Sequence, residues 1–125
     1  MSAALKAIPL TIASGQSLSN GALLGDYTLC GINFPAGWTT AAVTFQLSFD
    51  DGATWVNLSD NTGTEVQVIT SALASKYYAL DPRDKNLAGL ALIRLRSGTS
   101  ATPVVQASAV TVNVVGRKMN AVAGN

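Results

Sequence analysis

The chain has 125 residues, no histidine and one cysteine, and it carries a formal net charge of +1. This length allows one domain with one hydrophobic core. The missing histidine excludes Ser-His-Asp and Cys-His catalytic arrangements and histidine-containing zinc sites, and a single cysteine excludes an intrachain disulfide.

The composition is apolar and weakly charged, with 48% hydrophobic and 12% charged residues. No apolar run approaches the roughly 18 residues that a membrane-spanning helix needs, so no membrane partner is expected. The first residues, MSAALKAIPL, lack a basic region followed by a long apolar stretch, and we expect no signal peptide. A chain with so few charges is expected to cover part of its surface with protein partners.

The dominant period of the sequence is two, which predicts β-strands with one buried face. Turn signals rich in Gly, Asn, Asp and Pro separate the apolar runs at fairly regular intervals. About eight short strands are predicted, over residues 7–12, 27–34, 43–49, 55–58, 65–69, 76–80, 90–96 and 110–114. This spacing predicts an all-β fold over residues 1–125: a single antiparallel β-sandwich, with a jelly roll preferred.

The clearest strands also predict which side chains face the core. The predicted inward-facing residues are Val43, Phe45, Leu47, Phe49, Ala91, Ile93, Leu95, Val110, Val112 and Val114. Arg94 and Arg96 alternate with apolar residues of their strand and are therefore predicted to face solvent.

No long segment has a convincing helical period. Residues 71–80 carry apolar residues at a spacing that would fit a short helix, but their adjacent tyrosines favour a turn followed by a strand. One helical turn is predicted after Asp81, because Asp81 can cap it, Pro82 suits the first helical position and Asp84 lies in the first turn. Gly89 is predicted to end this turn.

Residues 48–55, Ser-Phe-Asp-Asp-Gly-Ala-Thr-Trp, match the pattern S-x-D-x-G-x-T-W of the Asp-box of sialidases and other β-propellers. A propeller needs several repeats of roughly 40–50 residues, and this chain has one copy of the pattern, so a propeller is excluded. Asp-Gly between two strand-like runs predicts a hairpin instead. We expect the Asp51 side chain to accept backbone N–H bonds in the turn and Trp55 to cover its base.

No catalytic residue, cofactor or metal site is predicted. A glycosidase needs two carboxyl groups that face each other across roughly 5–10 Å, whereas Asp50 and Asp51 are adjacent on a tight turn. Asp50, Asp51 and Asp60 lack the regular ligand spacing of a calcium loop. Cys30 lies in an apolar run and is predicted to be a small buried residue.

Two further features leave alternatives open. Trp38 and Trp55 could stack on sugars, which keeps a carbohydrate-binding module as an alternative, although packing in the core or an interface explains both. Residues 1–75 hold one basic and five acidic residues (net −4), and residues 76–125 hold seven basic and two acidic residues (net +5). Either interleaved strands mix these charges in space, or opposite patches help subunits to dock. The basic residues do not cluster with aromatic residues, so nucleic-acid binding is not expected.

The two ends, residues 1–6 and 119–125, are rich in small residues. Alone they are expected to fray, and against a neighbouring subunit they could order as arms.

Five short motifs in a fixed order resemble a family of small virion structural proteins of tailed bacteriophages. The motifs are Pro-Ala-x-Trp-Thr-x-Ala at 35–41, Asp-Gly-x-Thr-Trp at 51–55, Asn-x-Gly-Thr-Glu at 61–65, Leu-Asp-Pro at 80–82 and Arg-Ser-Gly-Thr-Ser at 96–100. The resemblance covers about residues 29–106, and the two ends match least. Within this class, size and β content resemble jelly-roll capsid cement (decoration) proteins.

The resemblance implies a non-enzymatic protein that is made in the host cytoplasm and binds the outside of the assembled capsid. Its implied partner is the major capsid protein, whose neighbouring subunits it would clamp. A tail or head-fibre adaptor of the same virion is an alternative. Self-association is also expected, with a dimer preferred and a trimer as the second choice. Together with the two ends, the candidate capsid or subunit interface comprises two loops, at 35–40 and 101–106, with the residues Pro35, Trp38, Thr39, Thr102, Pro103, Val104 and Val105.

Overall fold

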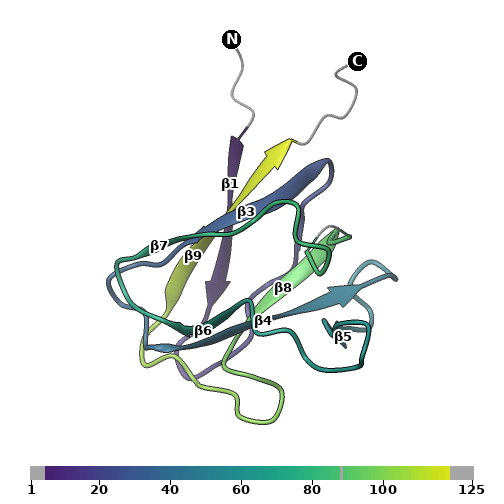
Figure 1. Cartoon of the computed structure of the whole chain (residues 1–125). Coiled ribbons are helices and arrows are strands. Elements are labelled where there is room, and N and C mark those ends of the chain that lie inside the picture. Colours follow the sequence, from purple (N-terminus) through teal and green to yellow (C-terminus); the bar gives the residue numbers. More distant parts are fainter. Residues whose placement is uncertain (1–4, 88, 119–125) are drawn as a thin grey trace.

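The period-two segments form strands, and the chain is all-β. The computed structural model describes residues 5–87 and 89–118 (Figure 1). The nine strands in these residues are β1 (Leu5–Ile12), β2 (Ala22–Leu23), β3 (Tyr27–Asn33), β4 (Ala41–Ser48), β5 (Val56–Asn57), β6 (Ile69–Ala72), β7 (Tyr77–Ala79), β8 (Leu92–Ser97) and β9 (Val110–Lys118).

The strands pair into two antiparallel sheets, which face each other in Figure 1. One sheet has the order β1-β9-β3-β7, and the other has the order β2-β8-β4-β5, with β6 also paired to β4. The pairs are nested along the chain: β1 with β9, β2 with β8, β3 with β7, and β4 with β6. Nested antiparallel pairing over two sheets is the connectivity of a jelly roll, as the sequence predicted.

The core lies between the sheets and consists of alternate residues from both of them. In β1, for example, Ile8, Leu10 and Ile12 are buried while the residues between them are exposed. Eight of the side chains predicted to face inward are buried: Val43, Phe45, Leu47, Ile93, Leu95, Val110, Val112 and Val114.

Three orientation predictions were wrong. Phe49 is 83% exposed, because β4 ends at Ser48 and the chain turns before Phe49 can face the core. Ala91 is exposed, because β8 begins only at Leu92. Arg96 does lie on the outer face of its sheet, as alternation requires, but it is only 7% exposed because a later-described loop segment covers it.

Local hydrogen bonds explain two differences in secondary structure. The helical turn predicted after Asp81 is absent from the described residues, which instead form consecutive turns. The carboxylates of Asp81 and Asp84 accept bonds from the backbone N–H groups of Arg83 and Asn86, both at 2.9 Å, and such short-range bonds compete with helix. The strand predicted at 65–69 forms later, as β6, because Glu65 bonds to side chains of another segment.

The turn-then-strand prediction for residues 71–80 is confirmed: a turn at 74–75 precedes β7. The short strand β2, in contrast, was not predicted. Its residues, Ala22 and Leu23, lack a period-two pattern, and the chain there is extended because it pairs with β8.

The nesting sorts the connections into two groups at opposite ends of the sandwich. Residues 13–17, 34–40, 73–76 and 98–109 connect strands at one end, which we call the loop end. The start of β1 and the end of β9 lie at the other end, where Leu5 pairs with Arg117. Eight residue steps of β9 separate the two ends, a distance of roughly 26 Å.

This arrangement changes the expectation for the ends of the chain. Leu5 and Lys6, which were grouped with a fraying arm, belong to β1 and pair with Arg117 and Gly116. Residues 1–4 and 119–125 lie outside the described residues. The candidate loops are therefore at the opposite end of the sandwich from the first and last described residues.

The interleaved strands also mix the two oppositely charged halves of the sequence. β8 and β9, from the basic half, pair with β1, β3 and β4 from the acidic half. The sequence asymmetry therefore reflects strand order, as one of the two interpretations predicted.

We expect Leu95→Ala to lower the free energy of unfolding by about 2–5 kcal/mol, because Leu95 is fully buried and its loss leaves a cavity. Leu23→Ala is the matched control, since Leu23 is 66% exposed. Urea unfolding followed by tryptophan fluorescence measures both variants. Equal stabilities for the two would contradict this description of the core.

Candidate functional site

The loop end is joined into one unit by backbone hydrogen bonds between segments that are far apart in sequence. The N–H of Gly15 donates to the carbonyl of Gln106 at 2.8 Å, and the N–H of Ser75 donates to the carbonyl of Pro35 at 3.2 Å. The N–H of Phe34 donates to the carbonyl of Lys76 at 2.9 Å. The four connections therefore form a linked surface instead of independent loops.

Gln106 is the polar centre of this end, and its side chain is fully buried. Its Oε1 accepts from the N–H of Thr39 at 2.7 Å, and its Nε2 donates to the carbonyl of Thr39 at 3.1 Å. Nε2 also donates to Oγ of Ser97 at 2.7 Å. One amide side chain thus fastens the 34–40 connection to the 98–109 connection. The sequence placed these two loops in one candidate interface, and the structure brings them together.

The candidate residues themselves divide by exposure. Val105 is 57% exposed, and Leu73, from a neighbouring connection, is 47% exposed. The remaining surface candidates are Thr102 and Pro103, which are exposed, and Pro35, Thr39 and Val104, which are half-buried. Val104 also packs against the core.

Trp38 does not belong to this surface, so its inclusion in the candidate interface was wrong. It is 4% exposed, its Nε1 donates to the carbonyl of Ala72 at 3.0 Å, and its ring centroid lies 4.8 Å from that of Phe34. A tryptophan near turn residues has the same sequence signal whether it points in or out. The hydrogen bond and the apolar contact together explain its burial.

The Asp-box forms the predicted hairpin turn. Asp51 and Gly52 have φ angles of 57° and 90°, and the N–H of Ala53 donates to the carbonyl of Asp50 at 3.2 Å. Positive φ at both central residues is typical of the Asp-Gly turn that joins antiparallel strands.

Asp50, and not Asp51 as predicted, is the aspartate that stabilises the hairpin. Its carboxylate accepts from the N–H of Thr54 at 2.8 Å, the hydroxyl of Thr54 at 2.6 Å and the hydroxyl of Ser48 at 2.8 Å. These bonds, first those from Thr54, lower the pKa of Asp50 from its ordinary value of 3.8 to about 2. The Ser and Thr of the pattern are thus explained as partners of this carboxylate.

Trp55 covers the hairpin, as predicted, and one face of its ring is occupied. Its Nε1 donates to the carbonyl of Gly52 at 3.1 Å, and the Arg94 guanidinium lies 4.6 Å from its ring centroid. Because Trp38 is buried, the two tryptophans do not form a shared stacking surface. The observation that kept the carbohydrate-binding alternative is thereby weakened.

Asp60 has a similar local role in the next turn. Its Oδ1 accepts from the N–H of Thr62 at 2.8 Å, the hydroxyl of Thr62 at 2.6 Å and the N–H of Thr64 at 3.1 Å. The bonds from Thr62 are the main reason that the pKa of Asp60 is lowered. In the part of the chain that the structure describes, no three His, Cys, Asp or Glu side chains are grouped to hold a metal ion.

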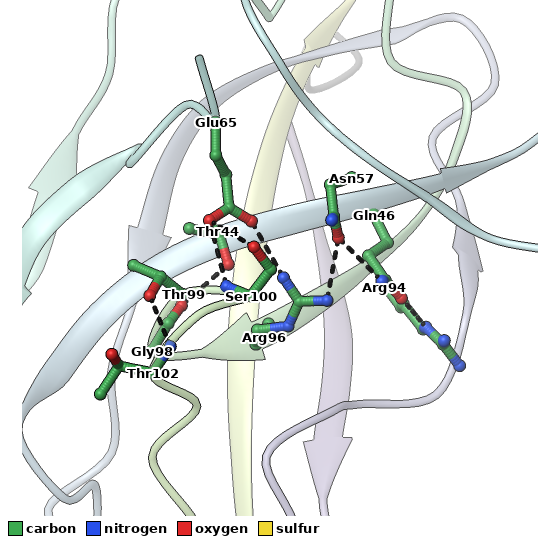
Figure 2. Close-up of polar contacts among 10 residues, drawn as sticks. All are labelled: Thr44, Gln46, Asn57, Glu65, Arg94, Arg96, Gly98, Thr99, Ser100 and Thr102. Carbon is green, nitrogen blue, oxygen red and sulfur yellow. Dashed lines mark hydrogen bonds and ion pairs between the residues drawn. The ribbon is translucent and has the colours of Figure 1, made fainter. Parts of the chain in front are cut away.

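A polar network on the outer face of the β2-β8-β4-β5 sheet binds the segment around Glu65 to that sheet (Figure 2). Nη1 of Arg96 pairs with Oε2 of Glu65 at 3.0 Å, and Nη2 of Arg96 donates to Oδ1 of Asn57 at 2.9 Å. The other Glu65 oxygen accepts from the N–H and the hydroxyl of Ser100, at 3.0 and 3.1 Å. This covering segment explains the burial of Arg96.

The network continues along the sheet through side-chain amides. Nε2 of Gln46 donates to Asn57 at 2.9 Å, and Nε of Arg94 donates to Oε1 of Gln46 at 2.7 Å. Among the described residues, every buried side-chain nitrogen and oxygen has a hydrogen-bond partner. The sequence did not reveal this network, because Glu65 and Arg96 are distant in sequence and neither has a local motif that names its partner.

Cys30 is half-buried in β3, so its predicted full burial was wrong. A β-bulge between Leu29 and Gly31 interrupts the alternation there. Burial raises the pKa of Cys30, and Arg117 opposes this effect.

Two open depressions lie away from the loop end. One, of about 390 Å³, lies between Leu58, Asp60, Lys85 and Leu90. The other, of about 470 Å³, includes the exposed side chains of Leu23 and Phe49. The chain has no helix among its described residues that is long and apolar enough to cross a membrane.

Comparison with known proteins found no matching family model, no matching curated protein and no matching solved structure.

We expect Gln106→Ala to destabilise the protein by about 2–3 kcal/mol, because the groups that Gln106 satisfies would lose their partners in a buried place. Gln16→Ala is the matched control, since the Gln16 side chain is exposed. Thermal unfolding measures the difference. Equal melting temperatures for the two variants would contradict the role of Gln106.

We expect the acid stability of the hairpin to depend on Asp50. Its pKa is lower in the folded chain, so its contribution is complete above about pH 4 and is lost as the pH falls through about 2. Asp50→Asn should therefore lose less stability than wild type over this range. Urea unfolding at several pH values measures the slope, with Asp51→Asn as the control that keeps the wild-type slope. Parallel profiles for wild type and Asp50→Asn would refute the assignment.

Proposed function

We propose that this protein is a non-enzymatic capsid cement protein of a tailed bacteriophage. It binds the outside of the assembled shell and clamps neighbouring major capsid subunits. The motif order over residues 29–106 supports the virion class, and the jelly roll that this resemblance implied is the fold of the chain.

The observation that carries the proposal is the linked loop end. Its connections are tied together by backbone bonds and by Gln106, so binding would cost little additional ordering of loops. It also exposes Leu73 and Val105, whose burial against a partner would be favourable. We therefore assign the loop end as the surface that contacts the capsid.

The polar groups that first suggested chemistry have structural partners. Hydrogen bonds from the chain itself hold the carboxylates of Asp50 and Asp60, and Glu65 pairs with Arg96 and Ser100. A cement function uses a stable scaffold of this kind. Many copies on a symmetric shell let a modest contact act multivalently, and preferential binding to the assembled form stabilises it by mass action.

The test measures binding of the purified protein to expanded shells from which it has been removed. Wild type should bind in numbers comparable with the major capsid protein and should raise the temperature at which the shells burst. A tail or head-fibre adaptor would instead bind in a few copies at one vertex. Failure to bind shells, or binding only at the tail vertex, would refute the cement function.

Charge introduced at the loop end tests which surface docks. Val105→Asp and Leu73→Asp should each weaken shell binding at least tenfold, because a carboxylate would be buried in the contact. Leu23→Asp is the control, since Leu23 is equally open but lies near the opposite end, beside β8. Equal binding by all three variants would show that the loop end is not the docking surface.

A further inference from the structure

The two edges of the β1-β9-β3-β7 sheet differ in whether they can accept another strand. At the β1 edge, the N–H of Thr11 donates to Oδ1 of Asn20 at 2.8 Å, and its carbonyl accepts from the N–H of Asn20 at 3.3 Å. Thr11 therefore points its backbone groups away from β9. By alternation Pro9 does the same, and proline has no N–H to offer. The β1 edge is thus blocked.

The β7 edge has the opposite character. The N–H of Phe34 donates to the carbonyl of Lys76, and the N–H of Leu80 donates to the carbonyl of Cys30, both at 2.9 Å. Even-numbered residues of this segment therefore bond to β3. The backbone groups of Tyr77 and Ala79 point outward, and both residues are exposed. No protein group among the described residues is recorded as their hydrogen-bond partner on that side.

The surface next to this edge is flat. The Tyr77 side chain lies across Gly31 on the neighbouring strand, where a Cβ atom would overlap its ring. The ring is nonetheless 52% exposed, so it has apolar area left to bury. An adjoining sheet would meet no protruding side chain at this point.

The segment is also complementary to itself in charge. Lys76 precedes β7 and Asp81 follows it closely, and both are exposed. If two copies of β7 pair antiparallel about a two-fold axis, with Tyr77 opposite Ala79, the Lys76 end of each strand lies beside the Asp81 end of the other. Opposite charges across paired strands stabilise the pairing and fix its register.

From these observations we propose that β7 is a self-association edge, at which a second copy of this chain adds its own β7 to form a continuous eight-stranded sheet across a two-fold axis. The inference concerns the free protein and does not depend on the capsid function. It selects the dimer and assigns the strand that forms it.

The first test is the mass in solution. Sedimentation equilibrium should show wild type reaching twice its monomer mass of 12.8 kDa as concentration rises. Hydrogen exchange of the Tyr77 and Ala79 amides should slow over the same range. A wild-type protein that stays monomeric at millimolar concentration, or a dimer in which these two amides exchange as in the monomer, would overturn the proposal.

Charge reversal gives a sharper test. Lys76→Glu and Asp81→Lys should each raise the dimer dissociation constant about tenfold or more, because each places like charges together twice across the two-fold axis. An equimolar mixture of the two variants should dimerise again, since each heterodimer contact then pairs opposite charges. Lys85→Glu is the control, as Lys85 is exposed but lies outside the segment. Single variants that dimerise like wild type, or a mixture that does not recover dimerisation, would refute the two-fold pairing of β7.

Discussion

The insertion of β9 between β1 and β3 is the constraint on which the rest of the fold depends. β9 is the longest strand and pairs with β1 on one side and β3 on the other. Once the last strand lies beside the first, the intervening strands can pair only in nested order without crossing connections. This nesting places four connections at one end of the sandwich and both ends of the described chain at the other.

The two outer faces of the sandwich are finished differently. On the β2-β8-β4-β5 sheet, the segment around Glu65 covers Arg96, and a fully hydrogen-bonded network satisfies the charges beneath it. A buried charge would be costly without such partners, so the network also fixes the position of this segment. The other sheet has no comparable cover among its described residues, and its outer face ends at the accessible edge of β7.

These differences suggest a division of labour within one small scaffold. The loop end gains rigidity from Gln106 and from backbone bonds, whereas the β7 edge keeps outward-pointing backbone groups. A protein that bridges anchored subunits benefits from two such surfaces, because contacts made on a shared lattice reinforce each other. The Asp-box, in contrast, is accounted for by the hairpin that it stabilises through Asp50 and Trp55.

The sequence by itself determined the fold class, most strands and the core, because alternation along a strand directly decides which side chains face inward. It also predicted the Asp-Gly turn, whose backbone needs are local. Tertiary structure alone decided the burial of Trp38 and Arg96, the role of Asp50 in place of Asp51, and the exposure of Phe49. Each depends on where a strand stops or on a partner distant in sequence, such as Ala72 for Trp38 and Glu65 for Arg96. Only the folded chain specifies those partners, because long-range pairing has no local sequence signal.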